Sequence, residues 1–247
     1  QLRDAVGEQA VSTDAAQIRE LSKDSSVRSK KAEAADRPLA AAQVVVTPHS
    51  TEQVSAVLSW ASTHGVPVVA RGLGSGVVGS GLPVRGGVLL DLAELTEVGE
   101  VDVVNRTVTV GAGINLGDLD TQLREQGLSV GHYPQSLYLA SVGGCVAMRG
   151  SGTFSSLYGN IEDRVGELEI VLPTGVVVQT RSLPRASTGP DLRQLGIGSE
   201  GMFGVITKVT LKLVPVPAAQ RFAAVRYAGF EGALETVRRG LIAGVRP

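Results

Sequence analysis

The stretch with the clearest chemical potential is Val66–Leu82, which reads VPVVARGLGSGVVGSGL. Glycine has no Cβ, so a glycine-rich chain can adopt positive φ and bring successive backbone N–H groups close to an anion. The stretch begins with a short apolar run and carries one cation, Arg71. These residue types, in this order, predict a loop at the end of a strand that wraps the phosphates of a cofactor.

Two familiar phosphate loops could use these glycines. Gly74, Gly76 and Gly79 spell G-x-G-x-x-G, and Asp91 lies near the position of the ribose-binding acid in nicotinamide-binding folds. That fingerprint requires a helix directly after the glycines, whereas Leu82–Gly87 contains a proline and a glycine pair without a helical period. A nucleoside-triphosphate loop needs a lysine, which is absent here. Both alternatives are disfavoured, and a glycine-rich turn without a ligand stays open at this point.

Composition excludes several classes of function. The chain carries a net charge of −1 and 4% aromatic residues, so nucleic acid is not expected as a partner. No apolar run reaches the roughly 18 residues of a membrane span, and no signal peptide is visible, so we expect a cytoplasmic protein without stable membrane insertion. Cys145 is the only cysteine, and the histidines lack ligand spacing, so neither an internal disulfide nor a metal site is predicted.

Three short apolar runs predict the strands that position the glycine loop. Val44–Val46 is followed by Ser50, which can cap a helix that ends at Gly65. The run Val66–Ala70 predicts a second strand, and strand, helix and strand together indicate a parallel βαβ unit. Val88–Leu92 predicts a third strand. The loop would then lie at the carboxyl end of a parallel strand, where open sheets bind ligands.

Hairpins and a capped helix follow in the second half of the domain. Val101–Val104 and Thr107–Val110 predict one hairpin. Asn115 can cap a helix that ends at Gly127. We place a subdomain boundary near residue 98, where the parallel units end. Gly166–Leu172 and Val176–Gln179 predict a second hairpin, and Gly204–Leu213 predicts a further strand.

The segment Gly131–Gly159 is too rich in glycine and serine to predict a core helix or a ladder strand. Its embedded apolar residues speak against disorder. A structureless stretch of this length inside a compact domain is usually functional. We therefore interpret it as a second segment that wraps the ligand.

Residues 1–40 are predicted to form a peripheral helical arm. They are polar and charged, with a helical period in Asp14–Leu21. The strongly charged Lys23–Arg37 is typical of a loop.

The ligand-binding domain is predicted to span residues 41–217. After it, Phe222–Tyr227 predicts a strand and Phe230–Leu241 predicts a helix. Residues 218–247 are therefore expected to begin another α+β unit that is incomplete, because the partners needed to cover its apolar face are missing.

Four ordered segments resemble the FAD-binding domain of the vanillyl-alcohol oxidase type, also called the PCMH-type FAD domain. They are Pro67–Leu82, Gly131–Gly152, Tyr158–Val165 and Gly198–Leu213. Four motifs in order are far more specific than one glycine pattern. The resemblance implies an α+β fold of two α+β subdomains, followed by the start of a truncated α+β cap domain, with FAD as the cofactor.

Two branches of this family resemble different parts of the chain. The first and last segments are similar to the FAD subunits of glycolate oxidase and D-lactate dehydrogenase. GHYPQSL, YGNIED and PRASTGPD (Pro184–Asp191) are more similar to alkyldihydroxyacetonephosphate synthase. Gln135 replaces an acidic residue that is frequent in the synthase-like relatives, which weakens the inference of a substrate. The branch stays open.

The resemblance also implies where FAD contacts the chain. The first loop would hold the diphosphate, the middle segment would follow the ribityl chain and the flavin, and the turn before the last strand would lie against the adenosine end. The implied cofactor-binding residues are Ala70, Arg71, Gly72, Leu73, Gly74, Ser75, Gly76, Pro134, Gln135, Ser136, Ser141, Gly143, Gly144, Met148, Arg149, Ser151, Gly152, Tyr158, Glu200, Gly201, Gly204, Val205 and Ile206.

Noncovalent binding of FAD is implied by two positions. Ser75 stands where several relatives carry the histidine that attaches FAD covalently. Cys145 stands where relatives carry other residue types, and we expect it to be a small packed side chain.

The resemblance implies hydride transfer from a 2-hydroxy acid or related alcohol to FAD, so we expect this chain to be part of an FAD-linked oxidase or dehydrogenase with a small-molecule substrate. In relatives the general base lies in the cap domain, so we assign no catalytic residue. His132, Arg149 and Glu162 are the nearest polar candidates, and each is expected to brace the loops. The alternatives are a flavin-dependent transferase of ether-lipid synthesis and a non-catalytic flavin-binding module. A homodimer is considered as well.

Overall fold

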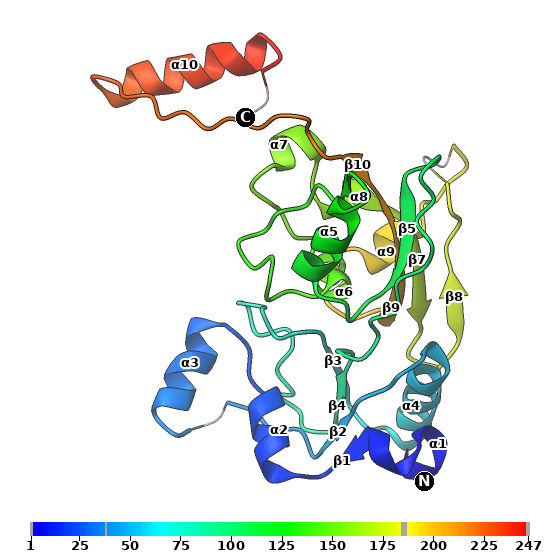
Figure 1. Cartoon of the computed structure of the whole chain (residues 1–247). Helices are drawn as coiled ribbons and strands as arrows, with labels where there is room; N and C mark the ends of the chain where they lie inside the picture. The colour runs from blue at the N-terminus through cyan, green and yellow to red at the C-terminus, as the bar shows by residue number, and fades with distance from the viewer. Residues whose placement is uncertain (1, 38, 184–186, 246–247) are drawn as a thin grey trace.

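The computed structural model describes residues 2–37, 39–183 and 187–245, which form two four-stranded sheets with helices packed on them, an α+β architecture (Figure 1). Pro184–Ala186, the start of the synthase-like segment Pro184–Asp191, lie outside the described residues. The elements of the first half are α1 (Leu2–Val6), η1 (Glu8–Ala10), β1 (Val11–Ser12), α2 (Ala15–Leu21), α3 (Val27–Ala34), β2 (Val44–Val46), α4 (Thr51–His64), β3 (Val68–Arg71), β4 (Val88–Asp91), β5 (Thr107–Gly111) and α5 (Leu116–Arg124). The later elements are β6 (Leu128–Ser129), α6 (Val142–Ala147), α7 (Ser155–Tyr158), α8 (Ile161–Arg164), β7 (Val165–Val171), β8 (Val177–Gln179), α9 (Arg193–Gly196), β9 (Val205–Lys212), β10 (Val214–Pro215) and α10 (Phe230–Ile242).

The first sheet has the strand order β1-β2-β4-β3. Strands β2, β4 and β3 are parallel, as the βαβ interpretation predicts, and β4 lies between the two strands of that unit. Side chains alternate across a strand, so Val46 and Leu90 pack with α4 on one face. Val45 and Leu89 pack with α2 on the other face. Both faces are covered, which explains the unbroken apolar runs of these strands.

The predicted capping residues set the helix ends. The Ser50 hydroxyl accepts a hydrogen bond from the backbone N–H of Gln53 at 3.4 Å, and Gly65 follows α4 with a φ of 64°. Asn115 caps α5 by accepting from the backbone N–H of Gly117 at 2.8 Å. Both helices are confirmed, although α5 ends at Arg124, before the end predicted at Gly127.

The second sheet is antiparallel, with the order β5-β9-β7-β8. The predicted hairpin formed by β7 and β8 is confirmed. The predicted strand Val101–Val104 is wrong, because only a single bridge joins Asp102 to Thr107. The Asp102 carboxylate accepts from the backbone N–H groups of Val104 at 3.0 Å and Asn105 at 2.8 Å, which holds this stretch as a turn. Strand β5 pairs with β9 instead.

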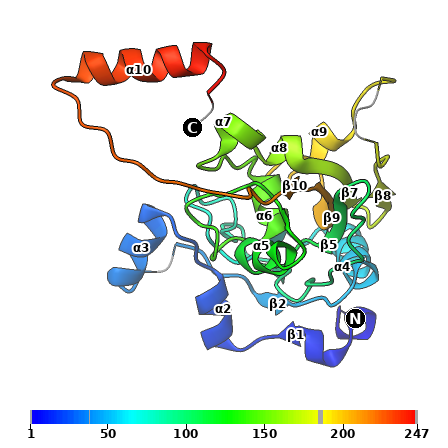
Figure 2. The same ribbon diagram turned by 45° about the horizontal axis from the view of Figure 1, so that its top comes forward.

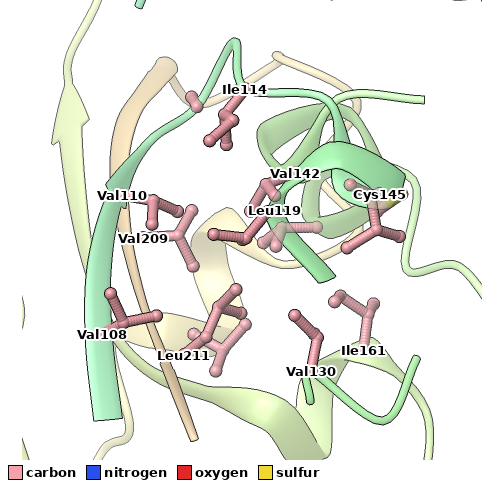
Figure 3. Packing of buried hydrophobic residues seen from close by; sticks show 14 of the residues in the cluster. Val108, Val110, Ile114, Leu119, Val130, Val142, Cys145, Ile161, Val209 and Leu211 are labelled. Atoms are coloured by element: carbon pink, nitrogen blue, oxygen red, sulfur yellow. The ribbon is translucent and has the colours of Figure 1, made fainter. Parts of the chain in front are cut away.

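The largest apolar cluster lies between the second sheet and helices α5 and α6 (Figure 3). Leu119 of α5 and Val142 of α6 pack against Val110 and Val209 of the sheet. A separate cluster contains the first sheet and α4. Two clusters on two sheets are consistent with a subdomain boundary near residue 98, which stays a prediction.

The N-terminal arm is an integral part of the fold. Helix α2 is confirmed, and Asp14 caps it by accepting from the backbone N–H of Gln17 at 2.7 Å. The loop predicted for Lys23–Arg37 is wrong, because α3 lies within it. Ser26 caps α3 by accepting from the Ser29 N–H at 3.1 Å, and the charged sequence of α3 concealed it because no apolar period is present. Strand β1 pairs with β2.

The segment Gly131–Gly159 contains a buried helix, so the expectation that it has no core helix is wrong. Ser141 caps α6 by accepting from the Gly144 N–H at 3.2 Å. A Cβ on Gly143 would come within 2.5 Å of the Ala112 Cβ. The glycines that lower helix propensity here are therefore the residues that let α6 pack against the neighbouring backbone.

The C-terminal residues extend away from the two sheets. Figure 2 shows α10 standing apart, joined to the body by an extended segment. Helix α10 is confirmed and has no buried residue, whereas the strand predicted at Phe222–Tyr227 is wrong, since those residues form no strand. Within the described residues, no helix has both the length and the apolar character to cross a bilayer.

Candidate functional site

The glycine loop leaves β3 at Arg71 and reaches β4 at Val88 without a helix. The backbone N–H groups from Gly72 to Gly76 donate no hydrogen bond to any other described residue. Gly74 has a φ of 74°, which only glycine adopts readily. The loop thus presents a run of free donors beside the Arg71 guanidinium, which is suited to an anion.

Asp91 forms an ion pair with Arg71. It is not among the residues that line the cavity described in the next paragraph. The two residues are partners in the register of β3 and β4. Arg71 Nη1 lies 3.9 Å from Asp91 Oδ1 and donates to the Gly72 carbonyl at 2.9 Å. Burial raises the pKa of Asp91, and Arg71 opposes this rise. The residue that resembled a ribose-binding acid is therefore the counter-ion of the loop's cation.

Three chain segments supply most of the lining of a cavity of about 250 Å³ that is partly open to solvent. They are the glycine loop, the segment from His132 to Gly150, and the residues from Ser199 to Ile206. The predicted residues that line the cavity are Ala70, Arg71, Gly72, Leu73, Gly74, Ser75, Gly76, Pro134, Ser136, Ser141, Gly143, Gly144, Met148, Glu200, Gly201, Gly204, Val205 and Ile206.

Five predicted residues lie outside this lining, namely Gln135, Arg149, Ser151, Gly152 and Tyr158. Arg149 Nε donates to Glu162 at 3.1 Å. Gly152 lies against the backbone of Tyr133, and Tyr158 lies against Gly131. These contacts brace the segment that forms the wall, so direct contact with a cofactor stays a prediction for the five.

His132 is buried in the wall of the cavity and is 1% exposed. Neither ring nitrogen has a hydrogen-bond partner among the described residues. Burial lowers the pKa of His132 to about 4, so the imidazole is neutral near pH 7 and can donate one hydrogen bond and accept another. A buried polar atom without a hydrogen-bond partner lowers the stability of the fold. A ligand in the cavity would supply partners for both ring nitrogens.

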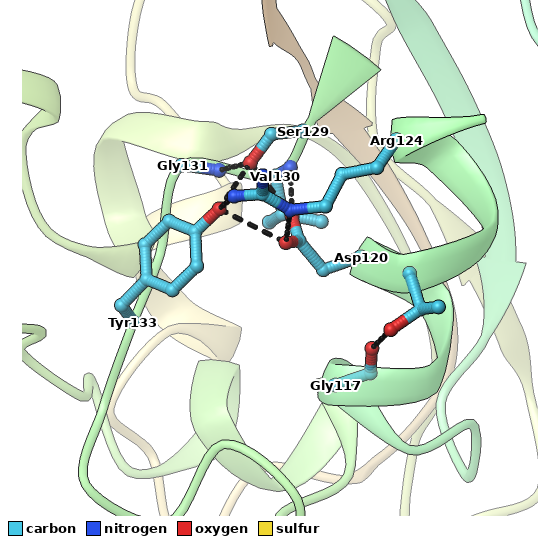
Figure 4. Close-up of polar contacts among 8 residues, drawn as sticks. Gly117, Asp120, Arg124, Ser129, Val130, Gly131 and Tyr133 are labelled. Atoms are coloured by element: carbon cyan, nitrogen blue, oxygen red, sulfur yellow. Dashed lines mark hydrogen bonds and ion pairs between the residues drawn. The ribbon is translucent and has the colours of Figure 1, made fainter. Parts of the chain in front are cut away.

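The buried carboxylate of Asp120 accepts hydrogen bonds from residues that precede and follow His132 in the chain (Figure 4). Asp120 Oδ1 accepts from the Val130 N–H at 2.9 Å and from the Ser129 hydroxyl at 2.7 Å. Asp120 Oδ2 accepts from the Tyr133 hydroxyl at 2.9 Å. No local pattern in the sequence indicated this network, because it joins α5 to Ser129 of β6 and to residues that follow this strand.

Helix α6 and the turn that precedes β9 form one wall. The N–H groups of Gly198 and Glu200 donate to carbonyls of α6, each at 3.0 Å. Glu200 itself has a φ of 51°, in the left-handed region. Cys145 of α6 lines the cavity, and burial raises its pKa to about 12, so the thiol is protonated and is a poor nucleophile.

Sequence reasoning missed the contribution of the N-terminal arm. Lys23 and Asp24, between α2 and α3, line the cavity. Ser80 and Ser199 do so as well. Nothing local in the charged stretch around Lys23 pointed to a ligand.

Comparison with known proteins identifies a matching family and several relatives. A family profile described as "FAD binding domain" matches residues 42–181. The chain is 33% identical over 208 residues to an alkyldihydroxyacetonephosphate synthase of Caenorhabditis elegans, covering 83% of this chain and 35% of the relative. It is 38% identical to the uncharacterized FAD-linked oxidoreductase YgcU of Escherichia coli strain K12, covering 82% and 42%. It is 32% identical to the glycolate oxidase subunit GlcD of Bacillus subtilis strain 168, covering 82% and 43%.

Solved structures agree with this result. A crystal form of an alkyldihydroxyacetonephosphate synthase superposes with a TM-score of 0.82 at 30% identity, covering 88% of this chain and 40% of the other. The chain therefore spans well under half the length of the relatives that it matches.

Proposed function

The chain belongs to the family of FAD-binding domains, whose cofactor is FAD, and on this premise we propose that it is the flavin-binding part of an oxidoreductase that acts on a 2-hydroxy acid or a related alcohol. The resemblance to the glycolate oxidase subunit GlcD supports this substrate class. The observation that carries FAD binding is the run of unpaired N–H groups from Gly72 to Gly76 beside Arg71.

The residues of the cavity fit FAD. The loop from Gly72 to Gly76 would hold the diphosphate, because oriented amides and one guanidinium bind anions without a metal. The unpartnered nitrogens of His132 would find donors or acceptors in the cofactor. Bulkier residues could not replace Gly143, since its Cβ would strike Ala112 and displace α6.

The bound flavin would supply the hydride acceptor of the reaction. The residues of this chain would bind and orient the cofactor. The buried wall around His132 would exclude water from one side of the cofactor. Cys145 is protonated and packed in α6, which supports noncovalent attachment. We assign no catalytic base within these residues.

The division of the chain is part of the proposal. Residues 41–217 would form the FAD-binding domain, and residues 218–247 would begin a cap domain that carries the substrate site. Support comes from α10, whose apolar side chains Phe230, Leu234 and Leu241 are exposed, as no residue of this helix is buried by the described part of the chain. The greater length of the relatives supports the same division.

A second candidate is a flavin-dependent transferase like alkyldihydroxyacetonephosphate synthase. It is favoured by the 33% identity to the nematode synthase and by the structural match at a TM-score of 0.82.

Anaerobic mixing of the FAD-loaded full-length protein with a panel of 2-hydroxy acids separates the two candidates. We expect the visible absorption of the oxidised flavin to bleach with at least one acid, because the flavin accepts the hydride. Exchange of an acyl for an alkyl group without net bleaching would support the transferase. If no acid in the panel bleaches the flavin, the oxidoreductase proposal fails.

A further inference from the structure

The connection between α2 and α3 lines the cavity with Lys23 and Asp24 and is attached to the glycine loop. Ser25 makes that attachment. Its backbone N–H donates to the Gly76 carbonyl at 2.9 Å, and its hydroxyl lies 3.4 Å from the Gly74 carbonyl. The arm thus binds the carbonyls of the same loop whose N–H groups donate to no other described residue.

Asp24, the residue before Ser25, lines the cavity. Its Oδ1 accepts from the Ser26 N–H at 3.1 Å, whereas its Oδ2 is buried and has no partner among the described residues. The neighbouring Lys23 does not neutralise it, because the Lys23 ammonium contacts Glu20 and Glu33, each at 2.6 Å. A carboxylate oxygen that is removed from water without a donor is strongly disfavoured.

We propose that Asp24 is a cofactor-binding residue, whose Oδ2 accepts a hydrogen bond from a hydroxyl or amino group of FAD. This inference rests on the proposed binding of FAD. A carboxylate repels a diphosphate, so its partner is one of the cofactor's neutral donors, a sugar or ribityl hydroxyl or the adenine amino group. Ser25 sets the position of Asp24 by fixing the arm to the glycine loop. The N-terminal arm is then a wall of the cofactor site.

The test compares Asp24→Ala with a control that disturbs the same turn without touching the cavity. Ser26→Ala removes the cap of α3 and keeps the Asp24 carboxylate. FAD affinity is measured by the change in flavin fluorescence on titration, and the folding of each apoprotein is checked by urea unfolding. We expect Asp24→Ala to weaken FAD binding roughly tenfold to a hundredfold, the effect of losing a hydrogen bond to a charged group. Ser26→Ala is expected to stay within about threefold of the wild type, since it leaves the proposed contact intact.

A second readout is the protection of the N-terminal arm from proteolysis by bound FAD. Trypsin can cleave after Lys23 and Arg28, which flank the contact, and FAD is expected to slow cleavage there in the wild type but not in Asp24→Ala. If Asp24→Ala does not fold, Asp24→Asn, which keeps the shape and loses the charge, is used, and a loss of at least about threefold is expected.

The experiment distinguishes a failure of the proposed function from a failure of the role proposed for Asp24. A wild type that binds no FAD would overturn the proposed function itself. A wild type that binds FAD, together with an Asp24 variant that binds it no more weakly than Ser26→Ala, would overturn only the role of Asp24.

Discussion

His132 is 1% exposed, and burial lowers its pKa to about 4. In the unfolded chain an imidazole titrates near pH 6.5. Between these two values the unfolded chain binds more protons than the folded protein, so stability falls as the pH is lowered through this window. The neutral form is the one that the buried wall accommodates, and it is the form available to a ligand at neutral pH.

We therefore expect the apoprotein to lose roughly 2 kcal/mol of unfolding free energy between pH 7 and pH 5 through this group alone. Urea unfolding at both pH values measures the loss. His132→Gln should remove this part of the pH dependence, whereas His49→Gln, at an exposed side chain, should retain it. An unchanged pH dependence in His132→Gln would show that the imidazole is not held neutral by burial.

Some site residues could be predicted one by one and others could not. Gly72 to Gly76 and Arg71 stand in a local pattern with a physical meaning, so the sequence was enough to propose them. Asp24 gave no such signal, because its place in the cavity depends on a contact between Ser25 and Gly76, which are far apart in the chain.

At the scale of elements, the sequence predicted helices correctly where capping residues mark their ends. It predicted them wrongly where long-range packing determines the structure. Ser50 and Gly65 mark the ends of α4 in the sequence. Helix α6 has two glycines and looked irregular, yet it packs into the core because Gly143 can approach Ala112. Tertiary packing there outweighs helix propensity.

Gly143→Ala tests this account of α6. Helix propensity alone would predict a gain in stability, but we expect a loss of about 1 to 3 kcal/mol, because the added Cβ must displace the backbone at Ala112. Gly81→Ala is the control, since a Cβ at Gly81 meets no atom within 4 Å. Urea unfolding of both apoproteins gives the comparison. A stabilised Gly143→Ala would mean that α6 and the Ala112 segment are not in close contact.

At the scale of the whole molecule, the cavity is assembled from both sheets and from the arm. The loop after β3 comes from the first sheet, α6 and the start of β9 belong with the second, and Asp24 comes from the arm. The sequence predicted both sheets and their approximate division, because the apolar runs are local. How the two sheets face each other around a shared cavity depends on long-range contacts, which no local pattern contains.

The central claim is that the glycine loop binds the phosphates of FAD, and the most direct test is an FAD titration of the wild type, Gly74→Ala and Gly127→Ala. Both glycines have similar positive φ, 74° and 71°, so both substitutions introduce similar backbone strain, on the order of 1 kcal/mol. A Cβ at Gly74 would also displace the Arg71 guanidinium, whereas a Cβ at Gly127 meets no atom within 4 Å. Only Gly74 lines the cavity. The account predicts that the wild type and Gly127→Ala bind FAD equally well and that Gly74→Ala binds it at least about tenfold more weakly. Equal affinity of the two variants, or no binding by the wild type, would contradict it.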